Sequence, residues 1–148
     1  MRALSTLLLV ALMLTMPASG RAQAWQPGFF ELQAFMPALY DFLWKAPTDP
    51  TGAVITPVLP PECRLRSRER KLSADGEIEL GRLQCPDGLA DKTLRFEGLV
   101  ASETEVIVRV NSGDGETETY RLGPVSPQIR FPPSRRHGRP CGARPRPG

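Results

Sequence analysis

Residues that bind metals or carry covalent catalysis are scarce in this sequence of 148 residues. It contains one histidine, His137, and three cysteines. A single imidazole excludes a His-rich metal site and any mechanism that uses two imidazoles, and three cysteines cannot fill a four-thiolate zinc site. The length excludes a large multidomain enzyme, because domains of roughly 100–200 residues are typical. We therefore expect no catalytic residue, no metal ligand and no cofactor, and a noncatalytic protein rather than an enzyme.

The formal net charge of +3 is unevenly distributed along the chain. Seven of the 19 basic residues lie in residues 1–24 and 134–148, which contain no acid, so residues 25–133 hold 12 bases and all 16 acids, a net charge of −4. Nucleic-acid binding relies on clustered cations that release counterions from phosphates. An acidic central segment predicts no nucleic-acid partner.

Residues 1–24 have the pattern of a secretory signal peptide. Arg2 provides the positive start, residues 3–16 are apolar and uncharged, Pro17 interrupts them, and small residues stand at 22 and 24. The alternative is a membrane anchor, but 14 apolar residues fall short of the roughly 20 that a spanning helix needs. We expect a signal helix that is cleaved before Trp25, and a periplasmic or secreted location in which disulfides form.

Short apolar runs separated by Pro, Gly, Asp and Asn fill residues 25–133 and predict β-strands. Val106, Val108 and Val110 alternate with charged Glu105 and Arg109, as expected when one strand face is buried. On such strands, solvated faces explain the many glutamates better than a carboxylate pair for acid–base catalysis. The fold class expected is all-β, a single small antiparallel β-sandwich, with strands at 29–35, 38–45, 54–59, 63–72, 77–85, 92–99, 105–111, 117–122 and 128–131.

Two hairpins are indicated by residues that tolerate positive φ, at 74–76 and at 111–115. The second contains Asp114 and two glycines, which is also the composition of a calcium loop. Such a loop needs several spaced carboxylates and a closing Glu. Because Asp114 stands almost alone, the pattern favours a simple turn.

The first hairpin predicts a disulfide between Cys63 and Cys85. Each cysteine lies 11 residues from Ala74, so a turn there places them opposite each other, where Cβ atoms approach to about 5 Å. Closure of the loop would stabilise the fold by roughly 3 kcal/mol. Ile78 and Leu80 share a parity that Leu83 and Cys85 do not, which predicts a bulge at Gly81.

Two clusters each allow a functional and a structural interpretation. The basic run at 64–71 (RLRSRERK) is either a contact strip for anions or a solvated strand face that blocks edge-to-edge aggregation, and the second is favoured. The aromatic residues either line a pocket or form the core, and strand spacing favours the core. They are Trp25, Phe29, Phe30, Phe35, Tyr40, Phe42 and Trp44.

Residues 134–148 contain five arginines and no aliphatic residue larger than Ala, and they hold Cys141, which has no partner in the predicted pairing. Such a composition builds no core and predicts a disordered tail. One interpretation is a basic arm for nucleic acid or anionic lipid. The other is a sequence introduced by a frameshift or truncation, which is favoured because basic arms usually accompany a basic face.

Several motifs, taken in order, resemble the extracytoplasmic N-terminal domain of HupE/UreJ-like membrane proteins. They are PGFFEL at 27–32, YDFLWKAP at 40–47, PVLP at 57–60 followed by Cys63, LQC at 83–85, GL at 88–89, FEGL at 96–99 and TEVIVRV at 104–110. The likeness covers about residues 26–131.

The resemblance implies a context more than an activity. In that family the domain precedes transmembrane helices whose His and Asp residues are associated with nickel or cobalt uptake for hydrogenase and urease maturation. We expect a noncatalytic exported domain of this kind without its membrane portion. Its partner would be an envelope or membrane protein, and it would meet the membrane only through the missing portion. The alternative is an independent secreted or periplasmic module that binds a protein or peptide at an open sheet edge and its aromatic N-terminal strands.

Overall fold

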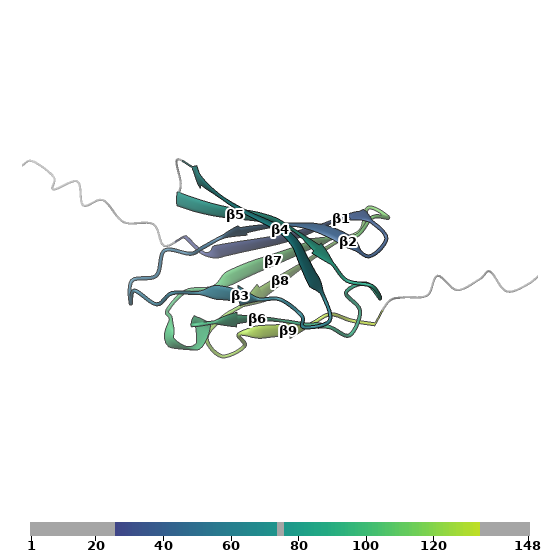
Figure 1. Ribbon diagram of the computed structural model, residues 1–148. Helices are drawn as coiled ribbons and strands as arrows, with labels where there is room; N and C mark the ends of the chain where they lie inside the picture. Colours follow the sequence, from purple (N-terminus) through teal and green to yellow (C-terminus); the bar gives the residue numbers. More distant parts are fainter. Residues whose placement is uncertain (1–25, 74–75, 134–148) are drawn as a thin grey trace, which may run out of the picture.

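A computed structural model describes residues 26–73 and 76–133 of the chain, which form two β-sheets (Figure 1). The expected signal helix at 1–24 and the expected tail at 134–148 lie outside these residues. All nine predicted strands are present in the described part, each shifted by no more than a few residues. The end of the sixth predicted strand instead forms a short 3-10 helix, η1 (Leu99–Ala101).

The larger sheet has six strands and the smaller has three. The all-β class is confirmed, and one pairing departs from the antiparallel rule, because β1 and β7 run parallel with Phe30 beside Val108. The larger sheet has the order β4 (Arg64–Ser73), β5 (Gly76–Gln84), β2 (Leu39–Lys45), β1 (Gly28–Met36), β7 (Val106–Asn111) and β8 (Thr117–Leu122), and the smaller has β3 (Thr56–Val58), β6 (Thr93–Glu97) and β9 (Gln128–Arg130).

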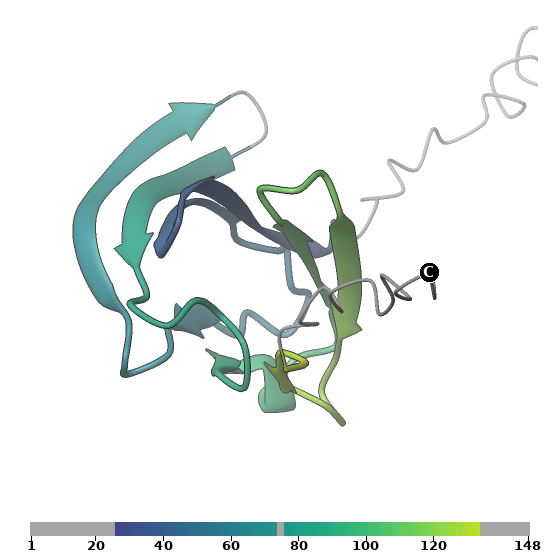
Figure 2. The same cartoon turned by 90° about the vertical axis from the view of Figure 1, so that its right-hand side faces the viewer.

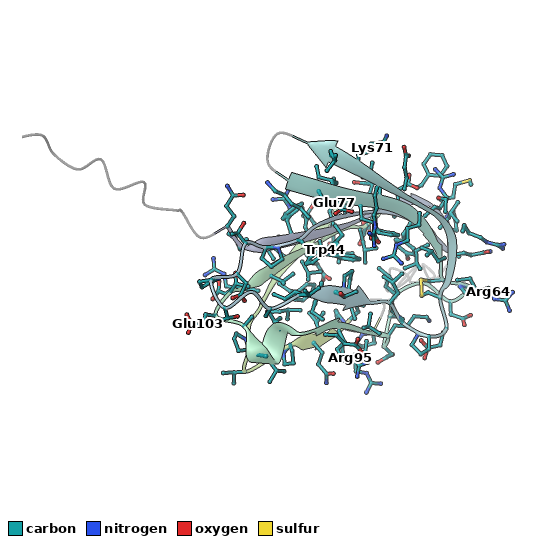
Figure 3. The ribbon with its side chains drawn as sticks, turned by 60° about the vertical axis from the view of Figure 1, so that its left-hand side comes forward. Trp44, Arg64, Lys71, Glu77, Arg95 and Glu103 are labelled. Atoms are coloured by element: carbon teal, nitrogen blue, oxygen red, sulfur yellow. A yellow bond between two sulfur atoms is a disulfide. The ribbon has the colours of Figure 1, made fainter. Side chains whose placement is uncertain are left out.

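Aromatic side chains join the two sheets. The Phe30 ring stacks on Phe42 of the neighbouring strand at 5.8 Å between centroids, and it meets Phe96 of the smaller sheet edge-on at 5.8 Å. Trp44 also reaches Phe96, at 5.3 Å, and Figure 3 shows it between the sheets. Each such ring contributes roughly 1.5–3 kcal/mol by burial. The core therefore lies between β1, β2 and β7 on one side and the smaller sheet on the other.

The β4–β5 hairpin is the least covered part of the larger sheet and curls away at one side (Figure 2). Side chains alternate between the two faces of β5, and the fully buried Leu83 marks the inner face. Glu77 and Glu79 lie on this same face. Leu72 lies opposite Glu77 on the same face, yet 90% of it is exposed. The inner face of the hairpin is therefore open to solvent near its turn.

The predicted bulge at Gly81 is wrong, because β5 pairs with β2 without a register shift. The extra residue is Arg66 on β4, where pairing moves from Ser67 opposite Arg82 to Leu65 opposite Leu83. Gly81 has another role. A Cβ atom there would lie 2.3 Å from the Phe42 ring and 2.5 Å from the Ser67 carbonyl oxygen, so only glycine permits this close packing.

Candidate functional site

The predicted disulfide between Cys63 and Cys85 is present, with the Cα atoms 4.3 Å apart. The bulge at Arg66 is what aligns the cysteines. If the register near the turn continued unchanged, Cys63 would face Pro86, but the extra residue brings Arg64 opposite Gln84 and the cysteines opposite each other. The bond therefore fastens the open end of the β4–β5 hairpin next to the core, where Cys85 is fully buried.

The aromatic cluster divides between the two faces of the larger sheet. Phe30, Phe42 and Trp44 are core residues, as the sequence favours. Phe29 and Phe35 face outward, where the guanidinium groups of Arg109 and Arg82 lie over their rings at 5.3 Å and 5.1 Å. Tyr40 is half-buried and Trp25 lies outside the described residues. The strands β1 and β2 that carry these rings are central and present no open edge.

Carboxylates accompany most of the basic run on β4. Arg68 binds Glu79 through Nε at 2.7 Å, and Arg70 lies 3.4 Å from Glu77. Lys71 is 3.5 Å from Glu69 of its own strand. Figure 3 shows Arg64 pointing away from the sheet into solvent. Because three of the five basic side chains of the run are paired with acids, the arrangement favours a solvated strand face over a strip that binds anions.

A cleft of about 320 Å³ opens at the end of the sandwich where the described chain reaches residue 133. Figure 2 views the molecule from this end. Its walls come from β1, β2, the loop at 87–90, the β7–β8 turn and residues 131–133. The buried side chains of Leu89, Val110 and Phe131 supply its apolar part. The cleft thus combines apolar surface with the polar rims of two loops.

The cleft is acidic. Of the described residues that line it, four are carboxylic acids, namely Asp87, Asp114, Glu116 and Glu118, and none is Lys or Arg. Carboxylates of one sign around a concave surface concentrate a negative potential there. The geometry therefore suits a cationic group attached to an apolar frame.

Two tyrosines stand beside the cleft with raised pKa values. Burial raises the pKa of Tyr40, although a hydrogen bond from the Leu89 backbone lowers it. Burial and then the neighbouring Glu118 raise the pKa of Tyr120 to about 12, because the phenol donates a hydrogen bond to the carboxylate at 2.6 Å and a phenolate would repel it. Both phenols are therefore neutral hydrogen-bond donors at neutral pH.

The acids of the cleft are too dispersed for metal binding. Within residues 26–73 and 76–133, no group of three or more His, Cys, Asp or Glu is arranged to hold a metal ion. The expected turn at 111–115 is confirmed. Gly115 donates to the Ser112 carbonyl at 3.0 Å, and Asp114 accepts from the Glu116 backbone at 3.2 Å. No helix in the described part is long and apolar enough to cross a membrane.

The sequence gives little indication of this cleft. Asp87 lies at least 27 residues before Asp114, Glu116 and Glu118, and only the sheet order brings its loop beside the β7–β8 hairpin. The parallel pairing of β1 and β7 places the β7–β8 turn beside the β1–β2 end of the sheet. The net charge of −4 over residues 25–133 predicts an acidic surface but does not indicate its position.

A scan against protein-family models gives no match for this chain, and a search of curated proteins gives none either. The resemblance to HupE/UreJ-like domains therefore rests on the order of the motifs and on the paired cysteines.

Proposed function

We propose that this chain is a noncatalytic exported β-domain of the kind that precedes the membrane helices of HupE/UreJ-like proteins, which are associated with nickel or cobalt uptake. In this role it would be exported by the signal at 1–24 and would meet an envelope or membrane protein. It would contribute no catalytic residue and no metal ligand of its own.

The observation that carries the proposal is the placement of the motifs. PGFFEL contributes to β1, YDFLWKAP to β2 and PVLP to β3, and Cys63 and Cys85 then close the next hairpin. The residues that carry the resemblance are thus those that build the core, namely Phe30, Phe42 and Trp44. Their agreement in order supports a common architecture, although a fold alone does not determine an activity.

The first test is the coding DNA beyond codon 133, read in its two other frames. The proposal expects a downstream frame that encodes apolar segments of about 20 residues, long enough to span a membrane. A downstream region without any such segment contradicts it.

The second test is a domain exchange in a nickel-uptake protein of the HupE/UreJ type. Residues 1–131 of this chain replace the native extracytoplasmic domain, and an unrelated exported β-sandwich of similar size serves as the control. Uptake of nickel should persist with this chain and fall with the control. Equal loss with both domains would count against the proposal.

The second candidate function is an independent secreted or periplasmic module that binds a protein or peptide. The cleft next to edge strand β8 favours it, because an extended peptide can pair with a sheet edge while its side chains enter a pocket. A native stop codon without a downstream membrane frame, together with a stoichiometric envelope protein that co-purifies with the chain, would favour this candidate. A chain that purifies alone from the periplasm would argue against it.

A further inference from the structure

The acidic cleft lies where a strongly basic segment begins. Pro132 and Pro133 are themselves part of its lining. The residues that follow, 134–148, contain five arginines, three prolines that each come directly after an arginine, and no acid. The cleft and residues 134–148 therefore carry opposite charges, and the segment begins directly after the prolines that line the cleft.

The first arginines of the segment are within reach of the cleft acids. Arg135 and Arg136 follow Pro133 by two and three residues, which is at most about 10 Å of extended chain. The cleft offers Asp87, Asp114 and Glu116 to guanidinium groups, which bind carboxylates in a bidentate manner. The half-buried Tyr40 also lines the cleft, and arginine can stack on an aromatic ring.

We propose that the acidic cleft binds the Arg- and Pro-rich segment 134–148 of the same chain. The composition of the segment predicts that it builds no core of its own. It can therefore bind to the rest of the chain chiefly through its charges, on a surface of opposite charge. Tethering favours the cleft over other acidic surfaces, because a short connection gives the segment a high effective concentration there. The inference does not depend on how the segment arose.

Ionic strength should control this contact. The acids lie at the surface, so their attraction to arginine is screened by salt, with a Debye length of about 30 Å at 0.01 M and about 3 Å at 1 M. We therefore expect a docked segment at low salt and a released segment at high salt.

The test uses Cys141, which is the unpaired cysteine when Cys63 and Cys85 form their disulfide. A spin label is attached to Cys141 of the full ¹⁵N-labelled chain without reductant, and paramagnetic broadening of backbone amides is measured by NMR. At low salt the amide signals of Gly88, Gly113 and Gly115 should lose intensity, whereas those of Gly52 and Gly98 at the opposite end should keep it. The loss should disappear in 1 M NaCl.

Matched variants show whether the cleft acids are responsible. Asp87→Asn combined with Glu116→Gln should abolish the broadening, and Glu77→Gln combined with Glu103→Gln, which removes the same charge from exposed sites elsewhere, should preserve it. Unchanged cleft signals at low salt, or equal broadening in both variants, would overturn the proposal. Broadening of a ¹⁵N-labelled chain by a separate spin-labelled chain would identify a second copy as the occupant and would also overturn it.

Discussion

One row of paired residues crosses the inner face of the six-stranded sheet and changes character from its centre to its β4–β5 edge. At the centre, Trp44, Phe30 and Val108 lie side by side and are buried beneath the smaller sheet. At the edge the same row continues into Glu79 and Arg70, and Glu79 is held by the arginines of β4.

The difference shows two ways of holding strands together in one sheet. The central strands gain free energy by removing apolar surface from water. The β4–β5 hairpin has little apolar surface to bury on its inner face, and ion pairs between exposed partners contribute little. The Cys63–Cys85 disulfide lies at the end of the hairpin that joins the core. We infer that this bond supplies the hairpin with the stability that packing supplies to the centre.

The largest effect is expected at the centre of the row. Phe30→Ala removes a fully buried ring that contacts Phe42, Trp44 and Phe96. The free energy of unfolding should fall by about 3–5 kcal/mol, because the variant loses the transfer free energy of the ring and leaves a cavity in the core. Chemical denaturation measures this loss, and Phe35→Ala, at an exposed ring, is the control. Similar losses for the two variants would contradict the division between centre and surface.

The next effect concerns the disulfide. Replacing both Cys63 and Cys85 by Ala should lower the free energy of unfolding by about 3 kcal/mol, since the unfolded chain regains the entropy of an open loop. Cys141→Ala is the matched control and should leave the stability unchanged. Thiol titration of the denatured, unreduced wild-type chain should count one free thiol. A count of three would show that Cys63 and Cys85 do not form the disulfide.

A smaller effect is expected for the ion pair at the edge of the row. Glu79→Gln removes the charge that Arg68 and Arg70 share, although Arg68 is 45% exposed and water compensates part of the loss. The cost should be about 1–2 kcal/mol in denaturant unfolding. Glu69→Gln, which removes an exposed partner of Lys71, should cost less than about 0.5 kcal/mol. A larger cost for Glu69→Gln would reverse the expected order.

The last effect is confined to alkaline pH and lies at the other end of the row, where Tyr120 is opposite Val108. Its pKa in the folded state is about 12, above the ordinary value of 10.0. Folding therefore favours the neutral phenol, and this contribution is complete below pH 10 and is lost as the pH rises through about 12.

An absorbance titration can follow this directly, because the chain has only two tyrosines and the pKa of Tyr40 is also raised. Phenolate should form later in the folded chain than in denaturant, and Tyr120→Phe should remove the later step. Ionisation of both phenols near pH 10 in the folded chain would contradict the hydrogen bond of the half-buried Tyr120 to Glu118.

Local patterns predicted the strands well because most central strands have one buried face and turn-forming residues at their ends. Val106, Val108 and Val110 alternate with polar neighbours and are all buried in β7. The two hairpins and the disulfide also followed from turn residues and spacing. These features depend on residues that are near one another in the chain.

The misplaced bulge has a physical cause. The apolar residues Ile78 and Leu80 lie on the outer face of β5, and the inner positions are Glu79 and Gly81, opposite Trp44 and Phe42. A buried glutamate is uncommon and requires partners, which here come from β4 after a bulge at Arg66. The cleft was missed for a similar reason, because a parallel pairing of β1 with β7 creates it and no local pattern indicates such a pairing.

Native-state hydrogen exchange before and after reduction of the disulfide tests most directly whether Cys63–Cys85 replaces packing in the hairpin. After reduction, amides of β4 and β5 should lose protection, whereas amides of β1, β2 and β7 should keep most of theirs. Uniform loss across all five strands, or unchanged protection in β4 and β5, would contradict this account.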